Sequence, residues 1–312
     1  MEKILYPLEW LVAWLMYLWH GLLTTVGLPE GAGSAWVLSI VGLTVTIRVI
    51  LIPLFVRQIH ASRGMQLVQP EIKAIQAKYK NKKDQASREA MSRETMAAYK
   101  KHGTNPFASC MPLLLQAPIF FALFRVLNNL KAISEGKHDP IGPISQLVAH
   151  DVEQSRLFGA ALSDSFVRST ETNVKIVVVI LILAMATTQF LTQRQLTMKN
   201  MPPSALEGPM AQTQKLMMYG MPVIMAISGV NFPVGVLIYW TVTNLWSSGQ
   251  QFYTIRRIPT PGSEAERRRN ERQSAKAAAK GIVLDSQTPK VIERPTGQRE
   301  QPKRKNRQKP KR

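Results

Sequence analysis

Arg48 is the residue with the clearest chemical potential, because it lies inside an otherwise uncharged apolar stretch, residues 34–56. A charge at the centre of a membrane span costs about 2.5 to 3.5 kcal/mol on insertion scales. The predicted spans of this chain hold no Asp or Glu, so Arg48 has no acidic partner within them. Arg48 either meets polar groups purely for packing, or it lines a water-filled cavity that attracts an acidic or polar ligand.

Polar side chains in the apolar stretches are candidates to surround this charge. Thr44 lies one helical turn before Arg48 and is expected on the same helix face. Later stretches offer Gln116, Gln189 and Asn244. Hydrogen bonds from such groups would offset part of the cost of burying the guanidinium.

Enzyme chemistry has little support in the sequence. The five histidines show no metal-ligand spacing, and the single cysteine, Cys110, cannot form an internal disulfide. No phosphate-binding GxxxxGK[ST], zinc-protease HExxH or nucleophile GxSxG motif occurs. We therefore predict a protein that is not an enzyme and that needs no cofactor or metal.

Charge and apolar residues are segregated along the 312 residues, whose formal net charge is +20. About twenty mainly apolar residues suffice to cross a bilayer as a helix. We predict an all-α polytopic membrane protein with a five-span helical core, the spans being residues 34–56, 107–127, 174–193, 216–230 and 232–253. The fourth is short enough to be a tilted or buried helix.

The N-terminal segment, residues 1–30, is apolar and rich in Trp and Tyr. Aromatic density of this kind is typical of an amphipathic helix at the membrane interface, which is the reading we favour. An additional span and a signal sequence are the alternatives. Against a signal sequence, Glu2 and Glu9 offset Lys3, and no small-residue cleavage site is clear.

Charge asymmetry orients the predicted spans. Polar segments 57–101, 194–215 and the tail after residue 253 hold 32 of the 40 Lys and Arg residues, whereas segment 131–171 holds more acids than bases. The positive-inside rule therefore predicts an extracytoplasmic N-terminus and segment 131–171, and a cytoplasmic C-terminus in the plasma membrane.

Two cytoplasmic segments could bind partners. Residues 57–102 show an a/d-type seam of Val68, Ile72, Ile75 and Tyr79, which predicts a cytoplasmic helical hairpin. The tail, residues 256–312, is basic and expected to be disordered from Pro259 onward. Its charge fits nucleic-acid phosphates or anionic lipids, or it only reinforces topology.

Three long motifs resemble the YidC/Oxa/Alb family of membrane protein insertases. They are TIRVILIPL at residues 46–54, CMPLLLQAPIFFAL at 110–123 after an Asn-Pro pair, and FPVGVLIYW at 232–240 with Asn244. QPEIK at 69–73 also resembles the opening of the family's hairpin. Order and spacing match across roughly residues 30 to 255, and the chain resembles the shorter Gram-positive type.

The resemblance implies an insertase whose five spans enclose a hydrophilic groove, with Arg48 as its basic residue. It implies that Gln116, Gln189, Trp240 and Asn244 line the groove wall, Gln189 by span position alone. Nascent membrane proteins would be the substrates, released sideways into lipid. The hairpin and tail would bring the ribosome, the signal-recognition pathway or the Sec translocon close.

Other functions remain open from the residues themselves. A transporter or channel could use Arg48 as an anion site, although no convincing internal repeat is present. A passive scaffold for membrane complexes is a further alternative, and it would have no need of a central charge.

Overall fold

The computed structural model describes residues 2–29, 34–82, 84–104, 111–201, 212 and 214–279. Residues 107–110 of the second predicted span, including Cys110, and the tail from residue 280 lie outside these ranges. The chain divides into two compact units, residues 1–269 and 270–312. Regular secondary structure in the described part is helical apart from one very short two-stranded hairpin and one isolated bridge, which agrees with the all-α prediction.

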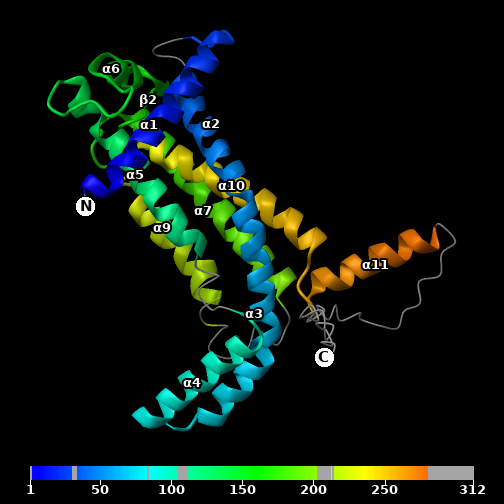
Figure 1. The fold of residues 1–312 in the computed structure, drawn as a ribbon. Helices are drawn as coiled ribbons and strands as arrows, with labels where there is room; N and C mark the ends of the chain where they lie inside the picture. Colours follow the sequence, from blue (N-terminus) through cyan, green and yellow to red (C-terminus); the bar gives the residue numbers. More distant parts are fainter. Residues whose placement is uncertain are drawn as a thin grey trace, which may run out of the picture. The chain divides into compact units, whose positions relative to one another are not determined.

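Figure 1 shows the order and packing of the elements. Their bounds are α1 Glu2–Thr25, α2 Ala35–Ile50, α3 Ile52–Tyr79, α4 Gln85–Lys101, α5 Met111–Ser134, α6 Gln146–Gln154, β1 Arg156–Leu157, β2 Ala160–Ala161, α7 Thr172–Asn200, the π-helix η3 Leu216–Gly220, α9 Met221–Gly229, α10 Val234–Arg257 and α11 Glu264–Ala278. The two strands pair antiparallel, with Arg156 opposite Ala161.

The hydrophobic core lies where α1, α2, α5, α7 and α10 meet. Its largest fully buried side chains include Trp36, Ile40 and Leu43 of α2, Leu123 and Leu127 of α5, and Tyr239 of α10. The start of α10 is held by the loop before α7, because the backbone N–H groups of Val234 and Gly235 donate to the carbonyls of Asp164 and Leu162. These bonds satisfy donors that a helix N-terminus otherwise leaves free.

The first predicted span, residues 34–56, is not one straight helix. It consists of α2 and the start of α3, which meet at Leu51 with a bend of 52°. Pro53 lies in the first turn of α3, where the absence of its N–H costs little and its ring stops the preceding helix. Arg48 therefore lies in the last turn of α2, directly beside the bend.

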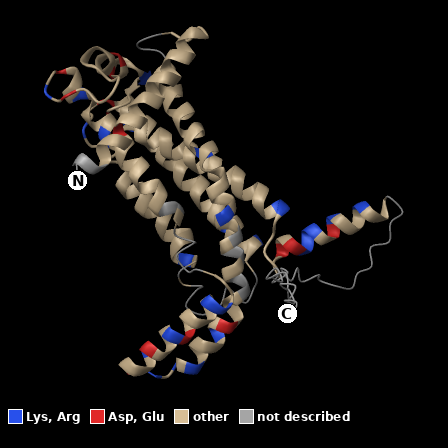
Figure 2. Cartoon of the chain, in the orientation of Figure 1, with Lys and Arg blue, Asp and Glu red and all other residues tan. Residues whose placement is uncertain are grey.

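Helices α3 and α4 pack on each other through a small apolar cluster of Val68, Ile72 and Ala98. Asp84 caps α4 by accepting a hydrogen bond from the N–H of Ser87 at 2.8 Å. Ion pairs flank the cluster, with Lys78 Nζ 2.5 Å from Glu94 Oε1, and Lys101 and His102 both contacting Glu71. Figure 2 shows that charged residues are frequent on α4 and sparse on α5, α7 and α9.

By length and apolar composition, α7 qualifies as a membrane span by itself, and α2 with Ile52–Ile59 of α3 qualifies as one bent span. η3 and α9 together form a shorter apolar helix, Leu216–Gly229. Both α7 and α9 expose large aliphatic side chains, among them Ile176, Ile180, Leu183, Val223, Ile224 and Ile227. Apolar surface on this scale fits contact with lipid.

The structure also differs from the expected disorder of the tail. Residues 264–278 form α11, and α10 runs to Arg257. Glu264 and Glu266 favour a helix N-terminus, and the Ser263 hydroxyl accepts a hydrogen bond from the N–H of Glu266 at 3.2 Å. This segment is poor in large apolar residues, which is why the sequence predicted disorder. Its Ala, Arg and Glu residues nevertheless have high helix propensity.

Candidate functional site

Arg48 is buried, with 6% of its surface exposed, between α2, α3 and α10. Its guanidinium carbon lies 5.3 Å from the centre of the Phe55 ring, across the bend between α2 and α3. It also interacts electrostatically with Tyr239 of α10. Within the described ranges, the Arg48 guanidinium forms no ion pair and no hydrogen bond with another side chain. The cation-π contact offsets only a small part of the cost of burying such a charge.

Tyr239 is the centre of the polar contacts around Arg48. It is 2% exposed, and its hydroxyl accepts a hydrogen bond from the Gln116 side chain of α5. Tyr239 thereby connects the predicted residues Arg48 and Gln116, which come from different helices. Sequence reasoning missed it, although a tyrosine hydroxyl in a buried span needs a partner and Thr243 lies one turn further on the same face.

The other predicted site residues have separate roles in packing. Thr44 is buried one turn before Arg48, and its hydroxyl donates to the Ile40 carbonyl of its own helix at 2.7 Å. Asn244 donates to the Met185 carbonyl of α7 at 3.3 Å. The structure therefore brings Thr44, Gln116 and Arg48 to one region, whereas Asn244 joins α10 to α7.

Trp240 lies in an aromatic cluster on α5 and α10. Its ring centre is 5.1 Å from that of Phe120 and 5.9 Å from that of Phe232. Gln189 lies on α7, half-buried, one turn after Met185. Among the described residues, the side chains of Trp240 and Gln189 form no hydrogen bond or ring contact with the side chains of Arg48 or Tyr239. Their part in a groove wall therefore stays a prediction.

Polar contacts continue between α7 and α10 beyond Asn244. The hydroxyls of Thr192 and Ser248 are hydrogen-bonded. Beyond the end of α10, the backbone N–H of Thr260 donates to the Asn200 side chain of α7 at 3.0 Å. Small polar side chains of this kind allow close helix approach inside a membrane. Among the described residues, no cluster of three His, Cys, Asp or Glu side chains could bind a metal ion.

A second arginine in an apolar helix, Arg125, contrasts with Arg48. Arg125 of α5 lies 2.7 Å from the carboxylate of Glu9 of α1, which is 3% exposed. This pair joins α1 to α5 beside the buried side chains of Val12, Ala13 and Met16. The fold therefore pairs the partly exposed Arg125 with a buried carboxylate, while the buried Arg48 meets only an aromatic ring and a phenol among the residues described.

Comparison with known proteins supports the resemblance carried by the motifs. The family profile described as "60Kd inner membrane protein" matches residues 28–261. The membrane protein insertase YidC of Streptomyces avermitilis is 45% identical over 264 residues, which cover 82% of this chain and 59% of that protein. This chain thus spans less than two thirds of the Streptomyces relative.

Two further relatives are covered nearly end to end. The membrane protein insertase YidC of Tropheryma whipplei (strain Twist) is 37% identical over 282 residues, with 87% of this chain and 90% of that protein covered. The protein of the same name from Bifidobacterium longum is 35% identical over 285 residues, with 90% and 84% covered. The profile match and these relatives together show that the chain belongs to the 60Kd inner membrane protein family, the family of the bacterial membrane protein insertase YidC.

Proposed function

We propose that this chain inserts nascent membrane proteins into the bacterial plasma membrane, and that Arg48 is the charge that receives their polar segments. The observation that carries the proposal is the burial of Arg48 without an acidic partner in the described structure. A positive charge that the fold leaves uncompensated attracts an acidic or polar group from outside. Family membership supports membrane protein insertion as the activity.

The proposed mechanism lowers a solvation barrier and requires no bond chemistry. A polar segment that crosses about 30 Å of hydrocarbon loses its hydration. A hydrophilic groove that reaches Arg48 would shorten this path, with Gln116 and Tyr239 as further polar groups on its wall. The apolar segment of the substrate would then leave sideways, driven by burial of its surface in lipid.

The proposed topology has five spans, an extracytoplasmic N-terminus and a cytoplasmic C-terminus. The charge distribution of the segments supports it, since α3, α4 and α11 belong to the basic segments of the chain. In this topology the α3–α4 pair and the basic tail face the ribosome, the signal-recognition pathway or the Sec translocon. Anionic lipids are additional partners for the tail.

An insertion assay in vesicles tests the proposal. Proteoliposomes that contain only this protein receive a small single-span substrate with a short acidic N-terminal tail, and protease protection of the tail measures insertion. We expect Arg48→Ala to reduce the protected fraction at least about fivefold. Two opposite charges about 4 Å apart attract each other by about 1 kcal/mol even in water, and losing that attraction corresponds to a factor of about five. Arg48→Lys should retain most of the activity, because it keeps the charge.

The control truncation removes residues 280–312, which leaves α10, α11 and the Thr260–Asn200 bond intact. Protection that is unchanged by Arg48→Ala would keep the insertase but contradict the role of Arg48. No protection in correctly oriented vesicles would favour the scaffold. Saturable anion flux through the vesicles, abolished by Arg48→Ala, would favour the transporter or channel.

A further inference from the structure

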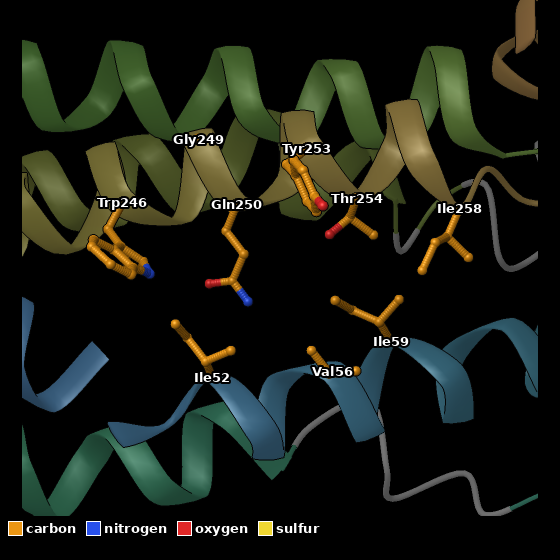
Figure 3. A pocket seen from close by; sticks show the side chains of 9 residues that line it. All are labelled: Ile52, Val56, Ile59, Trp246, Gly249, Gln250, Tyr253, Thr254 and Ile258. Atoms are coloured by element: carbon orange, nitrogen blue, oxygen red, sulfur yellow. The ribbon is translucent and has the colours of Figure 1, made fainter. Parts of the chain in front are cut away.

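A cavity of about 440 Å³ lies between the start of α3 and the end of α10, beyond the bend beside Arg48. Ile52, Val56 and Ile59 form its α3 wall, and their spacing puts them on one helix face. Figure 3 shows these side chains pointing toward α10, with Ile52 opposite Trp246 and Gln250 and Ile59 opposite Tyr253 and Thr254. The proposed insertase activity uses none of these residues.

The lining of the cavity is mostly apolar, and its two polar side chains on α10 lie between the ends. Trp246 and Ile258 mark its two ends on the α10 side, with Tyr253 between them and Gln250 and Thr254 as polar groups. Twelve residues of helix correspond to roughly 18 Å at 1.5 Å per residue. This length is comparable to one leaflet of hydrocarbon, about 15 Å.

The rim near Ile258 is basic. Arg256 and Arg257 are exposed in the last turn of α10, and the Arg257 guanidinium lies 5.7 Å from the ring centre of Tyr253, which lines the cavity. The nearest acids along the chain, Glu264 and Glu266, are engaged within their own segment, Glu264 with Arg268 and Glu266 with the N–H of Gly262.

We propose that this cavity binds one acyl chain of an anionic phospholipid, whose phosphate meets the basic rim of Arg256 and Arg257. Each basic side chain near an anionic headgroup favours such binding. The bound chain would fill the space between α3 and α10 and hold the two helices in register.

Gly249 gives a direct way to close the cavity. A Cβ at Gly249 would meet no atom within 4 Å, so a larger side chain there enters the cavity without clashing with the protein. Gly21 of α1 has the same open surroundings and lies away from the cavity, so it provides the matched control. Both changes replace a helical glycine with leucine and should favour the helix equally.

The test uses the full chain in bilayer nanodiscs that contain phosphatidylglycerol with a photoreactive group in one acyl chain. Mass spectrometry locates the cross-links. In the native chain we expect cross-links to both walls of the cavity. Gly249→Leu should reduce this labelling about tenfold, because at least two methylene groups of the acyl chain lose their buried position. Gly21→Leu should leave the labelling unchanged. The double variant Arg256→Gln and Arg257→Gln should lose the preference for phosphatidylglycerol over an equally photoreactive phosphatidylcholine.

Three results would overturn the proposal. The first is equal labelling of the cavity walls in Gly249→Leu and the native chain. The second is equal labelling of the native chain by phosphatidylglycerol and phosphatidylcholine. The third is displacement of the lipid label by an added single-span peptide, which would assign the cavity to a substrate helix instead. All readouts are of binding, so they are independent of the outcome of the insertion assay.

Discussion

Replacing Arg125 with methionine should destabilise the helical core strongly, because it leaves the Glu9 carboxylate without its ion-pair partner. Arg125 Nε lies 2.7 Å from Glu9 Oε1, and the side chains are 28% and 3% exposed. Removing one member of a buried ion pair costs about 3 to 5 kcal/mol, since the remaining charge keeps its desolvation penalty. The partial exposure of Arg125 argues for the lower end, about 3 kcal/mol.

This free energy corresponds to a large shift in thermal unfolding. At about 2 to 4 °C per kcal/mol for a chain of this size, Arg125→Met should lower the Tm by roughly 6 to 12 °C. The tryptophans of α1, Trp10, Trp14 and Trp19, provide the readout, because their fluorescence changes when α1 leaves α2 and α5. Unfolding is followed by fluorescence in detergent micelles at fixed protein concentration.

The control is an exposed ion pair of nearly the same length. Lys137 Nζ lies 2.6 Å from Glu135 Oε2, with the side chains 73% and 40% exposed. Lys137→Met should leave the Tm almost unchanged, because solvent screens the pair. The double variant Glu9→Gln and Arg125→Met should recover part of the loss, since it removes the stranded charge. Equal Tm values for Arg125→Met and Lys137→Met would refute the reasoning.

Three more predictions test other parts of the structure. Arg48→Met should raise the Tm by a few degrees while insertion falls, because replacing an uncompensated buried charge with an apolar side chain favours the fold by about 1 to 3 kcal/mol. Gly235→Ala should cost about 1 to 3 kcal/mol in the same unfolding measurement, since its Cβ would lie 2.8 Å from Leu127 Cδ1. Hydrogen bonds from His102 and then Lys101 lower the pKa of Glu71. The ionised Glu71 carboxylate therefore stabilises the α3–α4 pair fully above the ordinary pKa of Glu, and this stabilisation is lost as the pH falls through the lowered pKa. Amide exchange in α3 and α4 should accelerate over that acidic range in the native chain and stay flat in Glu71→Gln.

The helical class and the family could be predicted from the sequence because both depend on local patterns. The Val, Ile and Leu run of α7 is apolar enough to be recognised as a span by composition alone. The motif around residues 110–123 is similarly specific, because it is long and uninterrupted. Such signals do not depend on which helices become neighbours in the fold.

Contacts between helices could not be predicted in the same way. Nothing local in the sequence links Glu9 to Arg125, or Gln116 to Tyr239, since each pair joins helices distant along the chain. The bend at Leu51 depends on Pro53, but proline alone does not decide between a kink and a break. Low apolar content predicted disorder where α11 forms, because that measure ignores helix propensity and capping.

The contrast between the two arginines explains why Arg48, and not Arg125, is the better candidate for function. Both come from apolar helices and both must offset the loss of water around a guanidinium. At Arg125 the fold supplies the carboxylate of Glu9, and the charge is neutralised inside the protein. At Arg48 the described residues supply the Phe55 ring and the hydroxyl of Tyr239, neither of which carries a full negative charge. A fold that pairs a partly exposed arginine with a carboxylate, but leaves a more deeply buried one without a carboxylate among the described residues, retains an electrostatic site that an incoming acidic or polar group can fill.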